Sequence, residues 1–202
     1  MNFVQPIRDP SIIEGIKEYL KYNNLRNYIF FCFGIYSGLR VSDLLKLQVF
    51  MVRNQTHITL IEEKTKNTRK KKKKKKFIIH PDLLPDLLRY IEDMDDNEYL
   101  FPSRQKKKST GEQGQPFDRT TAYRMLNTVA RRFGLTEIGC HTMRKTWGYH
   151  LYVSDPINAA INLALLMDMF GHSDPTVTLR YLGLTQDVMD QAIRRLSYTK
   201  NS

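Results

Sequence analysis

The residues best suited to chemistry lie in three short segments that are far apart in the sequence. Arg40 falls in "YSGLRVSDL", His141 and Arg144 fall in "CHTMRK", and His172 and Tyr181 fall in "GHSDPTVTLRY". Guanidinium and imidazole groups donate hydrogen bonds to the oxygens of an anion such as a phosphodiester. A phenol can attack the phosphorus as a nucleophile. Together these groups indicate phosphoryl transfer, for which only an acid for the leaving oxygen is still needed.

The spacing of these residues carries further information. His141 and Arg144 are three residues apart, so on a helix they share one face. His172 precedes Tyr181 by nine residues, and the Asp-Pro pair between them is typical of a helix start. Each residue alone has an ordinary structural explanation: Arg40 could contact a helix end, and Tyr181 could be a packing residue among eleven tyrosines. Their combination favours a shared site.

The elements that must position the first segment are predicted to be helices. "DPSIIEGIKEYL" begins with Asp-Pro, contains a capping box formed by Ser11 and Glu14, and has apolar residues at helical spacing. A buried helix follows and is expected to end at Gly38. Ser42 or Asp43 is then expected to cap a short helix directly after Arg40.

The rest of the chain is also predicted to be mainly helical. "HITLIEE" and "FIIH" are β-branched and aliphatic runs on either side of a lysine-rich connector, which indicates an antiparallel hairpin or part of a three-stranded sheet. A later helix should be capped by Asp118 and closed by Gly134. The predicted fold class is therefore mainly α with a small antiparallel β-sheet (α+β).

The composition narrows the class of protein. The chain has 202 residues, 41% of them hydrophobic, which suffices for one domain. Its longest apolar run is far shorter than the ~20 residues of a membrane-spanning helix, and the N-terminus lacks the pattern of a secretion signal. We therefore predict a cytoplasmic protein with no membrane partner. Cys32 and Cys140 form no C-x-x-C pair, so reduced, buried thiols are expected rather than a disulfide or zinc site.

The charge of the chain favours a polyanionic partner. The net charge is +11, and cationic side chains that neutralise phosphates release condensed counterions. Nucleic acid is the first candidate. The seven consecutive lysines from Lys70 to Lys76 account for much of this charge, and subtracting them leaves +4. The charge alone therefore does not identify the partner.

Taken in order, the three segments resemble the tyrosine recombinase (phage integrase) family. The family's first arginine lies in a T-G-L-R-x-S-E/D-L segment similar to "SGLRVSDL", and its H-x-x-R box is similar to "HTMR". Its L-G-H-S segment is similar to "FGHS", and its nucleophile is a tyrosine at the spacing seen here. The resemblance implies the tyrosine recombinase catalytic-domain fold and extends from about the first helix to the C-terminus.

The resemblance also implies how the chain is organised. Residues 1–202 would form a single catalytic domain, with no N-terminal core-binding domain in this chain. Its parts would be helices over 10–47, a β-hairpin region over 56–80, helices over 81–182 and a C-terminal helix over 185–197.

By this resemblance the chain is a site-specific DNA recombinase or integrase that works through a 3′-phosphotyrosyl intermediate on Tyr181, without metal or cofactor. Arg40, Arg144 and His172 would hold the nonbridging oxygens of the phosphate, and His141 would exchange a proton with the phenol. The carboxylate of Asp43, one helical turn from Arg40, would orient a guanidinium or a histidine of this group. Relaxation of supercoils by a type IB topoisomerase-like enzyme and a catalytically vestigial DNA-binding protein are the alternative functions.

The family's general-acid lysine lies at the turn between two strands, where "EEKTKNTRKKKKKK" stands here. Lys64 is the best match for this acid, and Lys66 is the alternative. The neighbouring cations are expected either to contact the DNA backbone or to form a solvated loop that contributes nothing. The residues predicted to contact DNA are Lys66, Arg69, Lys70, Lys71, Lys72, Lys73, Lys74, Lys75 and Lys76.

The expected partners are double-stranded DNA and further recombinase protomers, as a tetramer on DNA. In "TQDVMDQAIRRLS", Val188, Met189, Ala192, Ile193 and Leu196 form an apolar stripe at helical spacing. The family resemblance implies that this helix docks onto a neighbouring protomer. Packing against its own domain is the equally weighted alternative.

Overall fold

The computed structural model describes residues 4–60, 74–103, 114–194 and 196. The chain forms two compact units, Met1–Trp147 and Gly148–Ser202. Lys64, Lys66, Arg69 and Lys70 to Lys73 lie outside the described residues. The predicted acid and most of the lysine run therefore stay predictions from the sequence.

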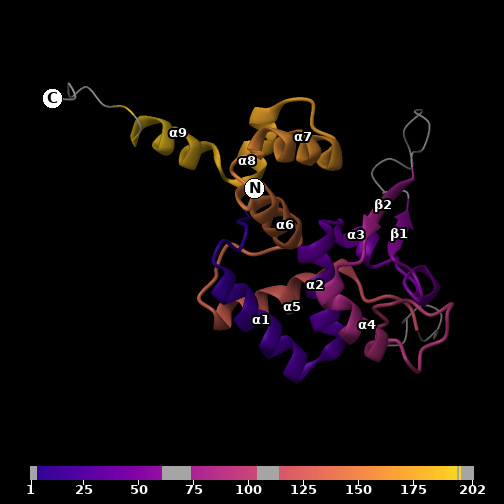
Figure 1. The fold of residues 1–202 in the computed structure, drawn as a ribbon. Helices are drawn as coiled ribbons and strands as arrows, with labels where there is room; N and C mark the ends of the chain where they lie inside the picture. Colours follow the sequence, from indigo (N-terminus) through magenta and orange to yellow (C-terminus); the bar gives the residue numbers. More distant parts are fainter. Residues whose placement is uncertain (1–3, 61–73, 104–113, 195, 197–202) are drawn as a thin grey trace. The chain divides into compact units, whose positions relative to one another are not determined.

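The described elements confirm the predicted fold class, since most are helices and the sheet consists of two antiparallel strands (Figure 1). The first unit contains α1 (Pro10–Asn23), α2 (Leu25–Ser37), α3 (Val41–Leu44), η1 (Val49–Met51), β1 (His57–Leu60), β2 (Lys75–Ile78), η3 (Pro81–Leu83), α4 (Leu84–Tyr90) and α5 (Arg119–Arg132). Helix α6 (Thr142–Val153) contains the boundary between the units, and α7 (Ala159–Phe170), α8 (Pro175–Leu182) and α9 (Thr185–Arg194) follow it.

Helix α1 begins with a different cap from the one predicted. The Asp9 side chain accepts a hydrogen bond from the Ser11 backbone N–H at 2.8 Å, and Pro10 occupies the first helical position. The capping box predicted for Ser11 and Glu14 is therefore wrong. Glu14 instead pairs with Lys17 at 2.8 Å, one turn along the helix. An aspartate directly before proline caps the helix without any help from Glu14.

The core of the first unit is built around α2. Ile29, Phe30, Phe31 and Cys32 on this helix are at most 1% exposed. The ring of Phe30 meets that of Phe101 edge to face, with centroids 5.1 Å apart. Burial of each large apolar side chain stabilises the fold by about 1.5–3 kcal/mol.

The two cysteines were both expected to be reduced and buried. Both are free thiols, but only Cys32 is buried, and Cys140 is half-buried.

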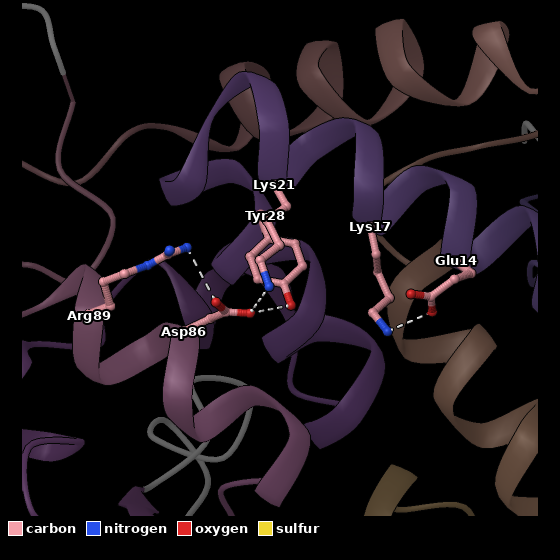
Figure 2. Close-up of polar contacts among 6 residues, drawn as sticks. All are labelled: Glu14, Lys17, Lys21, Tyr28, Asp86 and Arg89. Atoms are coloured by element: carbon pink, nitrogen blue, oxygen red, sulfur yellow. Dashed lines mark hydrogen bonds and ion pairs between the residues drawn. The ribbon is translucent and has the colours of Figure 1, made fainter.

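One carboxylate ties three helices of this unit together (Figure 2). Asp86 on α4 accepts hydrogen bonds from Lys21 Nζ on α1 at 2.7 Å and from the Tyr28 hydroxyl on α2 at 2.9 Å. Arg89 lies 3.3 Å from its other oxygen. Burial raises the pKa of Asp86, but the hydrogen bonds from Lys21 and Tyr28 outweigh it and the pKa falls below its ordinary value. The carboxylate therefore stays charged and holds these helices in place.

The predicted hairpin is present, and its second strand begins earlier than expected. Strands β1 and β2 pair antiparallel, with Leu60 opposite Lys75 and Thr59 opposite Lys76. The last lysines of the run are thus part of the strand rather than of a solvated loop. Phe77 supplies the reason, because it is 4% exposed and packs into the core while Lys76 beside it faces solvent.

Two glycines let α2 and the first part of α6 approach closely. Gly34 and Gly38 are one helical turn apart, and so are Met143 and Trp147 opposite them. A Cβ atom on Gly34 would lie 2.8 Å from the Met143 Cβ, and one on Gly38 would overlap the Trp147 ring. Gly38 also ends α2 with φ of +62°, as predicted. The contact requires glycine at both positions.

The other helix boundaries support most of the sequence predictions. Asp118 caps α5 by accepting from the Thr121 N–H at 2.6 Å, and Gly134 follows the helix with φ of +73°. The predicted cap of the short helix is wrong: α3 begins at Val41, its N-cap residue is Arg40, and neither Ser42 nor Asp43 caps it.

The second unit is organised by the turn between α7 and α8. Gly171 ends α7 in the left-handed conformation, with φ of +71°. Asp174 then caps α8, accepting from the Thr176 N–H at 2.6 Å, and Pro175 is the first helical residue. The helix start predicted from Asp-Pro is confirmed. Gly148 packs closely against Phe170 and Leu182, where a Cβ atom would lie 2.8 Å from each side chain.

None of the described helices is long and apolar enough to cross a membrane. Among the described residues, no group of three or more His, Cys, Asp or Glu side chains lies close enough to hold a metal ion.

The glycine contact generates a stability prediction. Gly38→Ala forces a side chain into the left-handed conformation and against Trp147, and should lower the free energy of unfolding by about 2–4 kcal/mol. Gly134→Ala is the matched control, because its φ is +73° but nothing lies within 4 Å of an added Cβ. It should cost only about 1 kcal/mol. Urea denaturation measures both, and equal losses would contradict the packing argument.

Candidate active site

Arg40 is held at the junction between α2 and α3. Its carbonyl oxygen accepts hydrogen bonds from the N–H groups of Asp43 and Leu44, both at 2.9 Å. The Arg40 side chain is half-buried, and Asp43 is 5% exposed. Gly38 ends the preceding helix two residues earlier, so the backbone of Arg40 is fixed from both sides.

Arg144 is anchored to the same junction. Its Nη1 donates a hydrogen bond to the carbonyl oxygen of Gly38, 106 residues away in the sequence. The residue is only 3% exposed. Because Gly38 and Arg40 belong to one turn, Arg144 lies near Arg40. A site shared by the two arginines requires this proximity.

His141 lies beside both arginines. It directly precedes α6, and its carbonyl accepts the N–H of Lys145 at 2.9 Å. The residue keeps solvent access, yet the protein around its ring lowers its pKa by desolvation, and the charges of Arg119, Arg144, Lys145 and Arg40 lower it further. A lowered pKa keeps the imidazole neutral near pH 7, and a neutral imidazole can accept a proton.

The second unit brings the other two predicted residues together. The rings of His172 and Tyr181 lie edge to face with centroids 5.6 Å apart, and Phe170 contacts both rings at 5.5 and 4.9 Å respectively. His172 Nδ1 lies 3.0 Å from the Thr178 hydroxyl oxygen. This contact fixes the orientation of the imidazole next to the phenol. Tyr181 itself is half-buried on α8.

The predicted residues therefore form two groups, one in each unit. Arg40, Asp43, His141 and Arg144 belong to the first unit, and His172 and Tyr181 belong to the second. Of the predicted DNA contacts, Lys74 and Lys76 are exposed and Lys75 is half-buried at the start of β2. Lys64 remains a prediction because it lies outside the described residues.

Several neighbours of these residues were not predicted from the sequence. Arg119 and Lys145 contribute positive charge around His141, and Thr178 and Phe170 contact His172. Lys145 could have been found, because it follows His141 by four residues and so shares its face of the helix. Arg119 could not, because it lies 22 residues before His141 and reaches it only through the tertiary fold.

The comparisons with known proteins identify the family and agree with the fold. The family model described as "Phage integrase family" matches residues 9–187. A probable integrase/recombinase, YoeC of Bacillus subtilis (strain 168), is 41% identical over 194 residues, covering 96% of this chain and 97% of that protein. The chain belongs to the phage integrase family and is a tyrosine-type site-specific recombinase.

More distant relatives are longer than this chain. A tyrosine recombinase of Pseudothermotoga lettingae (strain ATCC BAA-301 / DSM 14385 / NBRC 107922 / TMO) is 26% identical, and the match covers 96% of this chain and 66% of that protein. The crystal structure of XerA recombinase has the same fold, with a TM-score of 0.68 and 20% identity over 96% of this chain and 65% of that one. The XerH recombinase, solved with its palindromic difH substrate, gives a TM-score of 0.65 at 14% identity, over 96% of this chain and 54% of that one.

The contact between His172 and Thr178 generates the second prediction. Thr178 is fully buried, so Thr178→Val should preserve packing while removing the hydroxyl that orients the imidazole. Covalent attachment to DNA should slow by about 10- to 100-fold, because small misplacements of a catalytic group have large effects on rate. Quenched-flow cleavage of a nicked DNA substrate measures this rate. Thr178→Ser keeps the hydroxyl and should react nearly normally; equal slowing by both variants would contradict this role.

Proposed function

We propose that this recombinase cleaves DNA by attack of Tyr181 on a phosphodiester, which leaves a 3′-phosphotyrosyl link and a free 5′-hydroxyl. The P–O bond to tyrosine forms as the P–O bond to the 5′ oxygen breaks. The reverse reaction with the 5′-hydroxyl of another strand rejoins the DNA. Because the phosphotyrosine keeps the energy of the broken bond, no external energy source is needed.

The observation that carries this proposal is the cationic group around His141. Arg40, Arg144, Lys145 and Arg119 all bring positive charge to one imidazole. Gathering like charges is unfavourable unless an anion binds among them. A phosphodiester supplies such an anion, and its developing charge in the transition state would be stabilised by the fixed guanidinium groups of Arg40 and Arg144.

The second unit supplies the nucleophile in this proposal. A free phenol has a pKa of about 10, so Tyr181 needs a proton acceptor at neutral pH. We assign that role to His141, whose lowered pKa keeps it in the accepting form. His172 would donate to a nonbridging oxygen of the same phosphate. Asp43, buried one turn after Arg40, would orient the guanidinium.

The leaving 5′ oxygen requires a proton donor. We assign this role to Lys64, with Lys66 as the alternative, on the family pattern of the hairpin. Lys66, Arg69 and the run from Lys70 to Lys76 would contact the DNA backbone and add affinity without sequence information. The exposed side chains of Lys76 on β2 and of Lys74 just before this strand support such contacts.

The proposed partner is double-stranded DNA, and the proposed assembly is a tetramer on that DNA in the cytoplasm. The solved XerH structure contains its difH substrate, and a lambda integrase structure is a dimer on a core site. Sequential cleavage and rejoining of two duplexes needs four phosphotyrosine links in all. A tetramer with one Tyr181 in each protomer supplies them.

Replacing the nucleophile tests the chemistry directly. Tyr181→Phe removes the attacking oxygen and keeps the ring that contacts His172 and Phe170. Folding and DNA affinity should therefore survive, while covalent attachment to a nicked DNA substrate falls below detection. Denaturing gel electrophoresis of protein mixed with labelled DNA detects the adduct.

Tyr149→Phe and Tyr152→Phe serve as matched controls and should both form the adduct. Attachment of the Tyr181→Phe variant at another tyrosine would contradict the assignment. Wild-type protein that binds DNA but never becomes attached would favour the vestigial alternative. Relaxation of supercoiled DNA without strand exchange would favour the topoisomerase alternative.

The exposed face of α9 supports assembly with other protomers. Met189 and Ile193 on α9 are 53% and 61% exposed, and Leu196, two residues after the helix ends at Arg194, is 59% exposed, although an apolar side chain gains by leaving water. The side chains of Val188 and Ala192 lie outside the described residues. We propose that this face docks onto a neighbouring protomer of the same recombinase, which would couple their active sites.

A charge placed on this face tests the docking. Ile193→Asp should abolish the tetramer on DNA and reduce strand exchange at least 10-fold, because docking would bury an unpaired carboxylate. Cleavage of a single half-site should remain. Gln186→Asp adds the same charge to an exposed polar position of α9 and should leave the tetramer intact. Light scattering of the protein–DNA complex distinguishes these outcomes, and an intact tetramer with Ile193→Asp would exclude trans docking.

A further inference from the structure

Lys145 is an unusual residue because its charged side chain is buried. The residue is 6% exposed, and its Nζ donates a hydrogen bond to the carbonyl oxygen of Val4 at 2.7 Å. Burial lowers the pKa of this lysine. Taking an ammonium group out of water is costly unless it gains a hydrogen bond or a charge partner. A methionine or leucine would fill the same space without this cost, so packing alone does not account for a lysine.

The segment that receives this hydrogen bond is clamped along its length. The Gln5 N–H donates to Glu137 O at 2.9 Å, and the Ile7 N–H donates to the Thr146 hydroxyl oxygen at 2.9 Å. Residues 4–7, which we call the N-terminal strap, therefore run against the start of α6 and the turn before it. Ile7 is 3% exposed, which shows that the strap is packed and not merely adjacent.

The strap holds the residues on either side of His141. Glu137 lies four residues before it, and Lys145 and Thr146 follow it by four and five residues. Gly139, between them, is so close to the strap that a Cβ atom there would lie 3.1 Å from Val4 Cγ2. The backbone that carries His141 and Arg144 is thus fixed from one side by the strap and from the other by the contact of α6 with α2.

We propose that Lys145 is a positioning residue of the active site: its buried ammonium ties the N-terminal strap to the first turn of α6 and sets the electrostatic environment of His141. The inference rests on the proposed function, in which His141 accepts the proton of Tyr181. Lys145 touches neither substrate nor reacting atoms in this proposal. It acts through His141.

The charge of Lys145 has a defined effect on its neighbour. Lys145 lies one helical turn after His141, and its positive charge opposes protonation of the imidazole. Desolvation and the charges of Arg119, Arg144 and Arg40 act on His141 in the same direction. A charge in a poorly hydrated position interacts more strongly than one in water. Removing it should therefore raise the pKa of His141 and shift the acid limb of the cleavage profile to higher pH.

Three variants of the full chain separate charge from packing. Lys145→Gln keeps a donor for Val4 O but removes the charge, and Lys145→Arg keeps both. Thr146→Val removes the hydrogen bond that the Ile7 N–H of the strap donates to the Thr146 hydroxyl oxygen, and it leaves the charge of Lys145 in place. The imidazole of each variant is titrated by NMR, and the His141 signal is identified among the five histidines by its loss in His141→Gln.

The expected results differ for each variant. Lys145→Gln should raise the His141 pKa by about 0.5–1 unit and move the acid limb of single-turnover cleavage by the same amount, with DNA affinity nearly unchanged. Lys145→Arg should restore both values. Thr146→Val should lower the melting temperature by about 2–4 °C and leave the His141 pKa where it is.

Two outcomes would overturn the inference. One is that the His141 pKa in Lys145→Gln equals the wild-type value, or that Thr146→Val raises this pKa by the same amount as Lys145→Gln. The other is a Lys145→Gln variant that does not fold, since Lys145 would then serve only the stability of the strap. The titration needs no DNA, so it remains decisive even if the wild-type protein fails to form a covalent complex and the proposed function is wrong.

Discussion

The close contact between α2 and the start of α6 is the constraint on which the first unit's site depends. Gly34 and Gly38 present no side chain, so Met143 and Trp147 lie directly on the α2 backbone. Only at this separation can Arg144 reach the carbonyl of Gly38 and come to lie beside Arg40. The contact joins segments more than 100 residues apart in the chain. A shared active site therefore requires these small residues as much as the charged ones.

The cationic group costs stability that the rest of the unit must offset. Arg144 and Lys145 are both buried, and each donates a hydrogen bond to a backbone carbonyl, Arg144 to that of Gly38 and Lys145 to that of Val4. These carbonyl oxygens belong to a turn and to the N-terminal strap, where they are available to accept hydrogen bonds from side chains. The large aromatic core around Phe30 and the Asp86 cluster supply stability elsewhere. A preorganised charged site commonly lowers the stability of a protein, and packing elsewhere in the scaffold offsets this loss.

Much of the fold and the order of the site segments could be predicted from the sequence because local signals encode them. Gly38, Asp118 and the Asp174-Pro175 pair mark helix boundaries through backbone chemistry that does not depend on distant residues. The errors have different causes. Asp9 rather than Ser11 caps α1, which is a local effect, whereas packing of Phe77 into the core extends β2 into the lysine run. Arg40 stands at the N-cap position of α3, where a hydroxyl or carboxyl cap was expected. The position of Lys145 beside His141 follows from the sequence, but its burial does not, because it depends on a strap 141 residues away. The roles of the predicted catalytic residues remain predictions.

The spacing of His172 and Tyr181 has a structural explanation that the motif alone does not give. Gly171 reverses the chain after α7, and Asp174 with Pro175 starts α8 three residues later. Thr178 then lies one turn before Tyr181, since helix positions three or four apart share a face. Thr178 therefore contacts the imidazole while Tyr181 places its ring beside it. One residue more or fewer between cap and tyrosine would rotate the phenol by about 100° around α8. The spacing is thus a geometric requirement of the turn, which holds the proposed nucleophile beside the imidazole that would bind the same phosphate.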